Sequence, residues 1–330
     1  MKNVYRYRFL WLSCLVSFFV CLWVMTVFFG RLYAIGTLKD QFEELERNLQ
    51  SMGYDFAYDD LHFYSFSPWQ IMRAKNFRIY SLDEKDFFQW TAEELNVDVG
   101  FFNAKSVDIY LGTQQSIQIN QKVWRIFLPG ADVKVRLKND AAKELNLSIK
   151  DVQIENLCLI DSLYLHIKHQ KMPYLSLKMD VQGVHIDNMT GWPLNKDISH
   201  IYVDGSVQGD WDTDVLFSEA FYEWIDKGGQ FIVQKAILNW KPLIVVANGQ
   251  VTFNENVEPM VSLNTASLAL LDVLDKLSEN NYISNKGAFV AKILLGNKAV
   301  QQNVTDKYKT VVSPLKISKD GVVLENIKIR

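Results

Sequence analysis

The sequence predicts a mainly β protein with a few helices, in which an N-terminal transmembrane helix precedes a long, twisted, mostly antiparallel sheet. Three observations support this fold class. An uncharged apolar run stands near the N-terminus, and period-two alternation of apolar and polar residues fills most of the remaining chain. The strand–helix–strand alternation of a parallel sheet is not recognisable in the pattern. With 330 residues, 48% of them hydrophobic, the chain is long enough for one large domain or two modest ones.

The apolar run from Phe9 to Gly30 contains no charged residue. A helix of this length spans roughly 30 Å, which matches the hydrocarbon core of a bilayer. The run is longer than the apolar part of a cleaved signal peptide, and no A-x-A site follows it. Cys14 follows a weak lipoprotein-like pattern, but it lies too early in the run. We therefore expect an uncleaved anchor over residues 1–34, whose membrane-facing residues are Phe9, Leu10, Trp11, Leu15, Phe18, Phe19, Leu22, Trp23, Val27 and Phe28.

The charges around the apolar run predict its orientation. Lys2, Arg6 and Arg8 precede it, whereas Arg31 alone follows. The positive-inside rule then places the N-terminus in the cytoplasm and the body on the other side of the membrane. Residues 1–37 hold these four positive charges and no acidic residue, so the remainder of a chain of net charge −3 carries −7. An acidic body argues against a nucleic-acid partner, because phosphate binding needs clustered Lys and Arg.

An amphipathic helix is expected over residues 35–53. Its apolar residues recur at spacings of four and three, and Gly53 is suited to end it. Lys39 and Asp40 begin a charged opposite side. We interpret it as a helix packed on the edge of the body. The apolar positions are Leu38, Phe42, Leu45, Leu49 and Met52.

Residues 54–330 are expected to form a β-rich body. Alternating segments predict half-buried strands at 106–111, 131–138, 145–154, 163–167, 175–181, 201–203, 230–240 and 243–253, and a closing hairpin at 311–317 and 322–329. Two helices interrupt them. One covers roughly 214–227, and the other starts near Ser267, a suitable N-cap, and continues to Leu277. The segment 190–197 is a candidate internal boundary.

The predicted strands greatly outnumber the predicted helices. Each half-buried strand has an apolar side that must leave water. So few helices do not suffice to cover so many strands. The sheet therefore closes, packs on a second sheet, or keeps an apolar surface for a ligand or partner.

The sequence contains no pattern that indicates catalysis or metal binding. His166 and His169 are three residues apart, so in a strand they lie on opposite sides and do not share an ion. Cys158 is the only cysteine after the anchor. No nucleophile elbow, dinucleotide-binding fingerprint or P-loop is present. Asp210, Asp212 and Asp214 resemble a calcium loop, but the later positions do not fit. We expect no enzyme activity and no cofactor.

The order of anchor, short helix and many short strands resembles the mostly alphaproteobacterial DUF2125 family of envelope proteins, which is related to the AsmA-like proteins. Segments 201–209, 229–240, 242–253 and 314–324 carry the resemblance. The second and third are similar to a family hairpin in which a strand containing Trp240 turns into one containing Gly249. Segment 84–190 is similar only in its strand character.

The resemblance implies a protein of the bacterial inner membrane that projects a curved, groove-forming sheet into the periplasm. Longer AsmA-like relatives are thought to carry phospholipid along such a groove. The expected function is thus binding or transfer of lipid acyl chains, or support of outer-membrane assembly. The alternative is a structural or interaction module that binds other envelope proteins and no lipid. The expected groove-lining residues are Leu163, Leu165, Ile167, Leu175, Leu177, Met179 and Val181.

Overall fold

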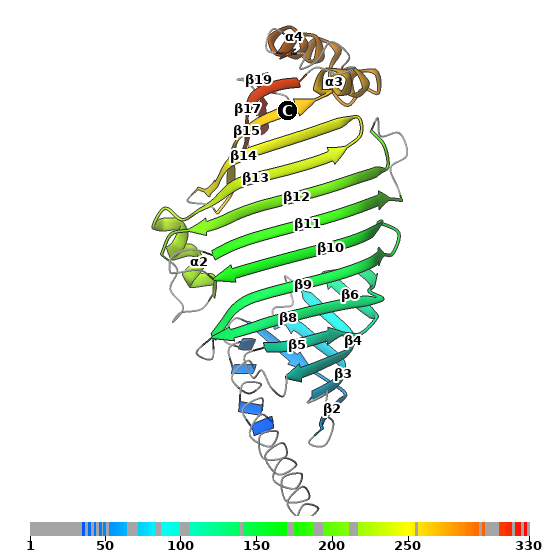
Figure 1. Ribbon diagram of the computed structural model, residues 1–330, viewed down its shortest axis with the longest axis vertical. Helices are drawn as coiled ribbons and strands as arrows, with labels where there is room; N and C mark the ends of the chain where they lie inside the picture. Colours follow the sequence, from blue (N-terminus) through cyan, green and yellow to red (C-terminus); the bar gives the residue numbers. More distant parts are fainter. Residues whose placement is uncertain are drawn as a thin grey trace, which may run out of the picture.

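The fold is a single antiparallel sheet with a few helices, which confirms the predicted mainly β class. It comes from a computed structural model (Figure 1) that describes residues 35–36, 39–40, 43, 46–47, 49–50, 53–64, 72–82, 87–99, 106–138, 141–169, 175–187, 194–210, 217–254, 257–296, 299–300, 310–318, 321–324 and 327–328. The anchor predicted over residues 1–34 lies outside these residues. Among the helices of the described part of the chain, none has both the length and the apolar character needed to cross a membrane.

The described residues form 19 strands of one sheet. The N-terminal strands are β1 (Tyr54–Ala57), β2 (Asp60–Phe63), β3 (Met72–Ser81), β4 (Phe88–Val99), β5 (Ser106–Leu111), β6 (Gln114–Ile119), β7 (Lys122–Phe127) and β8 (Gly130–Lys138). The central strands are β9 (Ala141–Ile154), β10 (Cys158–His169), β11 (Leu175–Ile186), β12 (Asp197–Gln208), β13 (Gln230–Trp240) and β14 (Leu243–Phe253). The C-terminal strands are β15 (Pro259–Leu268), β16 (Ala299–Val300), β17 (Thr310–Ser318), β18 (Gly321–Leu324) and β19 (Ile327–Lys328).

In the central part of the sheet, neighbouring strands follow one another in the chain. From β9 to β15 each strand pairs antiparallel with the next, and β15 pairs with β17. Short connections suffice for such a meander. The pairing of β11 with β12 continues the sheet across the segment 190–197. The sheet turns strongly at its N-terminal end, where β6 lies behind β8 and β9 (Figure 1).

Two pairs of short strands are single strands with a bend. β5 and β6 both pair with β4, and β7 and β8 both pair with β9. At the bend, the Gly112 amide donates to the Glu94 carbonyl, and the Leu128 amide donates to the Thr113 carbonyl. The irregular positions stand side by side in register, and we call this row the crease. It comprises Asn76, Glu93–Glu94, Gly112–Thr113, Leu128–Pro129 and Asp151.

The helices lie at the ends of the sheet. The described residues between 35 and 50 are helical, and Gly53 follows with a φ of 80°, as the sequence predicts for this helix. Helix α2 (Phe217–Asp226) joins β12 to β13, while α3 (Leu270–Glu279) and α4 (Asn285–Gly296) lie beyond β15 (Figure 1).

The expected N-cap at Ser267 is wrong. Ser267 belongs to β15, where it pairs with Val245 and Val311. The residue before α3 is Ala269, which has a left-handed backbone (φ 60°) and makes no side-chain cap hydrogen bond. Strand pairing on both sides of Ser267 thus outweighs its local preference for a cap. Helix α4 has no counterpart among the predicted helices.

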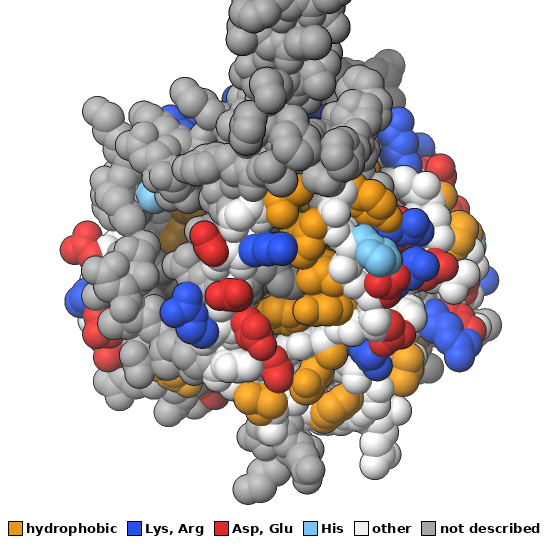
Figure 2. All heavy atoms as spheres, turned by 90° about the horizontal axis from the view of Figure 1, so that it is seen from below, with side chains coloured by type: hydrophobic (Ala, Val, Ile, Leu, Met, Phe, Trp, Pro, Cys, Tyr) orange, Lys and Arg blue, Asp and Glu red, His pale blue; other side chains and the backbone are white. Residues whose placement is uncertain are grey.

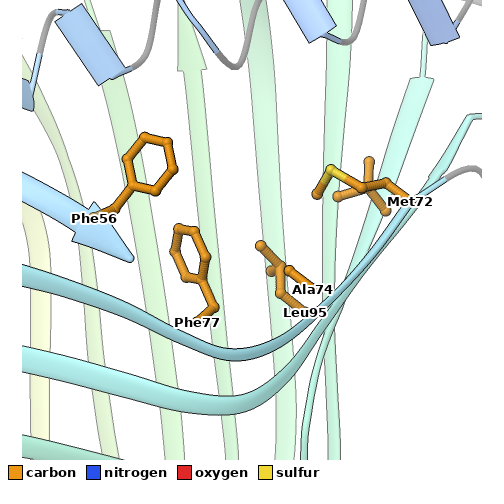
Figure 3. Packing of buried hydrophobic residues seen from close by; sticks show 6 residues of the cluster. Phe56, Met72, Ala74, Phe77 and Leu95 are labelled. Carbon is orange, nitrogen blue, oxygen red and sulfur yellow. The ribbon is translucent and has the colours of Figure 1, made fainter. Parts of the chain in front are cut away.

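The N-terminal end of the sheet holds the best-packed core. Met72, Ala74 and Phe77 are at most 3% exposed. Leu49 of the preceding helix packs against this cluster. Figure 3 shows Phe56 and Phe77 turned toward one another, with ring centroids 5.6 Å apart. A second cluster at the other end joins Leu274, Ala291, Leu295 and Val311, so α3 and α4 cover the sheet there.

Candidate functional site

The structure places the expected groove-lining residues together on one side of the sheet. In the pairing of β10 with β11, Leu163 stands opposite Val181, Leu165 opposite Met179, and Ile167 opposite Leu177. Directly paired residues of antiparallel strands lie on the same side. Leu175, which stands opposite His169, completes the set. We call this side the apolar face.

The apolar face continues far beyond these two strands. Two rows of directly paired residues cross the sheet from β2 to β14 without a polar side chain. One row is Phe63, Met72, Val97, Ile109, Val133, Leu147, Leu165, Met179, Val203, Ala236 and Ala247. The other is Leu61, Ala74, Leu95, Leu111, Ala131, Ile149, Leu163, Val181, Ile201, Leu238 and Val245.

Among the described residues, helices cover the apolar face at its ends but not at its centre. The helix at residues 35–50 contributes Leu49 to the N-terminal cluster, and α3 and α4 pack over β17. At one end of β12–β14, Trp224 of α2 packs against Phe253, and the centroids of the two rings are 6.0 Å apart. The central cluster, in contrast, contains residues of β9 to β13 and of no described helix.

The apolar side chains at the centre are accordingly neither fully buried nor fully exposed. Leu165, Ile167 and Met179 are partly exposed, although they are large and apolar. The N-terminal end of the molecule also shows hydrophobic side chains that gather in its middle, with charged side chains around them (Figure 2). Such an extended apolar surface is suited to an apolar ligand or partner.

One buried thiol belongs to the apolar face. Cys158 pairs with Ile154 and Ile186 at the start of β10. Burial raises the pKa of its thiol, and Asp187 adds to this effect. The thiol therefore stays protonated at neutral pH and behaves as a small apolar side chain rather than as a nucleophile.

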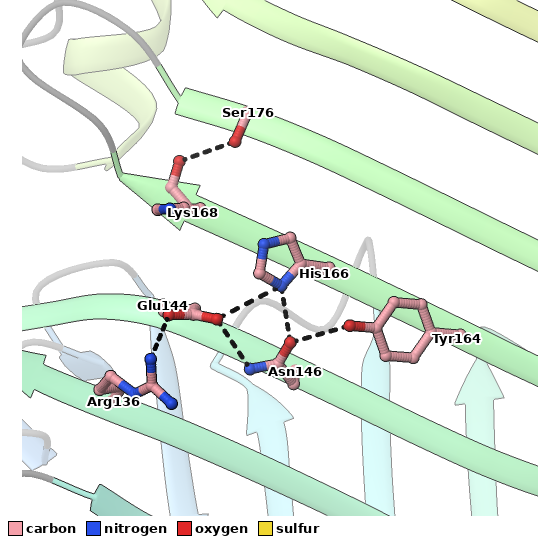
Figure 4. Close-up of polar contacts among 7 residues, drawn as sticks. All are labelled: Arg136, Glu144, Asn146, Tyr164, His166, Lys168 and Ser176. Atoms are coloured by element: carbon pink, nitrogen blue, oxygen red, sulfur yellow. Dashed lines mark hydrogen bonds and ion pairs between the residues drawn. The ribbon is translucent and has the colours of Figure 1, made fainter.

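The opposite side, which we call the polar face, is a network of paired side chains. Figure 4 shows Asn146 Oδ1 accepting from the Tyr164 hydroxyl at 3.0 Å and lying 2.6 Å from His166 Nδ1. Glu144 accepts from Arg136 at 3.1 Å and lies 3.7 Å from His166. These residues come from three neighbouring strands, so the network ties β8, β9 and β10 together.

Charge pairing continues along the polar face. Lys178 lies 3.2 Å from Asp204, and His200 lies 3.2 Å from Asp180. The hydrogen bond and charge of Asp204 raise the pKa of Lys178. Burial and the same carboxylate raise the pKa of Tyr202. Both Lys178 and Tyr202 therefore keep their protons at neutral pH, and neither is suited to act as a general base.

Metal ligands do not converge in the described part of the chain. His166 pairs with Lys178 and His169 with Leu175, so the two imidazoles lie on opposite faces, as the sequence predicts. Within the described residues, no group of three or more His, Cys, Asp or Glu side chains is placed to hold a metal ion.

Helix α4 carries apolar surface that sequence reasoning missed. Its inner side, with Ala288, Ala291 and Leu295, is buried. Its outer side is apolar too: Phe289, Val290, Ile293 and Leu294 are between 45% and 64% exposed. Apolar residues all around a helix give no helical periodicity, although they are themselves a signal that both sides need a partner.

Comparison with family models, with curated proteins and with solved structures gives no match to this chain. Its function is therefore inferred from the geometry of the sheet.

Proposed function

We propose that this chain is a non-enzymatic envelope protein of the AsmA-like type, related to the DUF2125 family, that binds lipid acyl chains along its apolar face. Residues 1–34 anchor it in the bacterial inner membrane, with the N-terminus in the cytoplasm and the body in the periplasm. The observation that carries this proposal is the continuity of the apolar rows across strands β9 to β13, where no described helix covers them.

The chemistry of acyl chains fits this surface. Burying hydrocarbon gains about 0.8 kcal/mol per CH₂ and needs neither a charged group nor a fixed pattern of donors. Leu165 and Met179 offer flexible or branched aliphatic surface, and their neighbours in the same row, Leu147 and Val203, are also aliphatic. A bilayer anchor next to such a face brings the protein close to its ligand.

Site-specific photocrosslinking tests the proposal with a matched control. A benzophenone amino acid at Met179 lies on the apolar face, and the same amino acid at Asp180 lies on the polar face. The full-length protein is irradiated in its native membrane and analysed by mass spectrometry. We expect phospholipid adducts at position 179 and few at position 180. Equal labelling at both positions, or none at 179, would contradict lipid binding by this face.

A second candidate is an interaction module of the envelope that binds other proteins and no lipid. The exposed outer side of α4 favours it, because Phe289 and Ile293 resemble the anchors of a protein interface. Under this alternative, the double variant Phe289→Ser, Ile293→Ser loses a protein complex on native gels while position 179 yields no lipid adduct. Lipid adducts that persist in the double variant would favour the first candidate.

A further inference from the structure

A polar cleft lies along the crease, on the side of the sheet opposite the apolar face. The regular alternation of side chains between the two faces is interrupted there. Asn76 and Asp151 have left-handed backbones, with φ of 47° and 53°. Such irregularities bend strands and re-aim side chains, and they are frequent at binding sites. The cleft has a volume of about 640 Å³ and is lined by Asn76, Thr91, Glu93, Gln114, Gln115, Ser116, Arg125, Ile126, Phe127, Gln153 and Glu155.

Several polar side chains of this cleft are unpaired. Other parts of the polar face hold cross-strand pairs, such as Lys178 with Asp204 and Tyr164 with Asn146. In the cleft, four polar side chains have no hydrogen-bond or ion-pair partner among the described residues. These are Glu93, Gln114, Ser116 and Gln153.

Gln115 belongs to the strand under the cleft, but its side chain lies on the other side of the sheet. It pairs with Ala92 and Ile126, and its side-chain oxygen accepts from the Trp90 indole at 2.9 Å. The residue is 8% exposed, so it helps to hold β4, β6 and β7 together beneath the cleft. The neighbouring residues of the same strand, Gln114 and Ser116, are the ones that face the cleft.

The chemistry of the cleft narrows the class of ligand. Glu93 and Glu155 outweigh Arg125, so the net charge is negative and a phosphate or nucleic acid is disfavoured. The cleft lies within the sheet, where strand pairing already uses the backbone groups, so an added peptide strand has no edge to join. The groups that can contact a ligand in the cleft are therefore amides, hydroxyls and carboxylates, beside the exposed aromatic ring of Phe127.

We propose that this cleft binds an uncharged, polyhydroxylated ligand, namely a short stretch of a glycan chain. Amides and carboxylates bond neighbouring hydroxyls of a sugar, and the Phe127 ring, which is 44% exposed, packs on the apolar side of a sugar ring. The volume lies within the range of about 300–1,000 Å³ that ligand pockets have. The site lies on the polar face, so it is independent of lipid binding by the apolar face.

Calorimetric titration of the full-length protein tests the proposal, in a detergent whose headgroup is not a sugar. The probes are a β-1,4-linked N-acetylglucosamine tetramer and maltotetraose. We expect at least one to bind, and binding to weaken at least tenfold in Phe127→Ala and in Gln153→Ala. The matched control is Gln118→Ala, which removes an amide from the same strand as Gln114 but outside the cleft, and it should bind like the native protein.

Equal melting temperatures of all variants show that a loss of binding is not a loss of fold. The proposal is overturned if neither sugar binds at millimolar concentration, or if binding is the same in Gln153→Ala as in the native protein. Binding of inorganic phosphate in place of either sugar also overturns it.

Discussion

The apolar face has the same kinds of side chain at its N-terminal end and at its centre, yet of these two parts only the N-terminal end is covered by a described helix. Met72 and Ala74 are 1% and 0% exposed beneath the helix that carries Leu49. Leu165 and Met179, in the same row as Met72, are partly exposed. Composition alone therefore does not decide which part of the face becomes core. The covered end forms a buried core, while at the centre large apolar side chains stay partly exposed.

The largest effect is expected from Phe77→Ala at the covered end. Phe77 is 3% exposed and packs against Phe56 and Trp90, so its removal leaves a cavity. We expect the free energy of unfolding to fall by about 3–5 kcal/mol, measured by denaturant titration of the full-length protein. The matched variant at the open centre, Leu165→Ala, should lose less than half as much. Equal losses would mean that the centre is core as well.

A polar substitution at the centre should separate stability from ligand binding. Leu165→Gln places an amide between Leu147 and Met179, where lipid chains are expected to lie. We expect phospholipid extracted from the purified protein to fall severalfold, with a loss of only about 1 kcal/mol in stability because water reaches the amide. Leu165→Met keeps volume and polarity and serves as the control. Undiminished lipid in Leu165→Gln would remove this row from the binding surface.

One ion pair on the polar face of the N-terminal end should make stability depend on pH. Burial alone would raise the pKa of Glu94, but hydrogen bonds from Asn96 and Arg73 and the charge of Arg73 outweigh it and lower the pKa. A lowered pKa in the folded state stabilises the protein above the ordinary value of 4.5, and this contribution is lost as pH falls through the folded pKa.

Arg73→Gln should therefore lower the free energy of unfolding slightly at neutral pH, because solvent screens a partly exposed ion pair. The difference from the native protein should shrink below pH 4.5 and vanish in stronger acid. Unfolding curves at several pH values measure it. A difference that stays constant with pH would show that Arg73 acts through packing rather than through its charge.

Regular alternation explains why much of the sheet is predictable from the sequence. The predicted strands 230–240 and 243–253 have the same bounds as β13 and β14, and the segment 106–111 has those of β5. The seven residues expected in the groove share one face because Leu163, Leu165 and Ile167 stand directly opposite residues of the next strand. The apolar side of a strand follows directly from the order of apolar and polar residues within that strand, so the sequence alone predicts it.

Features that depend on several strands at once escape sequence reasoning. The crease appears only when register places Asn76 of β3, Asp151 of β9 and the residues between them in one row. One sign of the crease is visible in the sequence, because the alternation of apolar and polar residues shifts by one position between Ile149 and Val152. The cleft residues are ordinary Gln, Ser and Glu in the sequence, and only the bend of the strands brings them together.

The smallest effect is expected on the polar face, next to the central apolar residues. Asp180 follows Met179 in β11 but points to the other side, where it lies 3.2 Å from His200. Both side chains of this pair are about one third exposed, so solvent screens their interaction. Asp180→Asn should change the free energy of unfolding by at most about 0.5 kcal/mol and leave the amount of extracted lipid unchanged. A loss of lipid in this variant would show that the ligand also needs the polar face, and the distinction between an apolar binding face and a structural polar face would then fail.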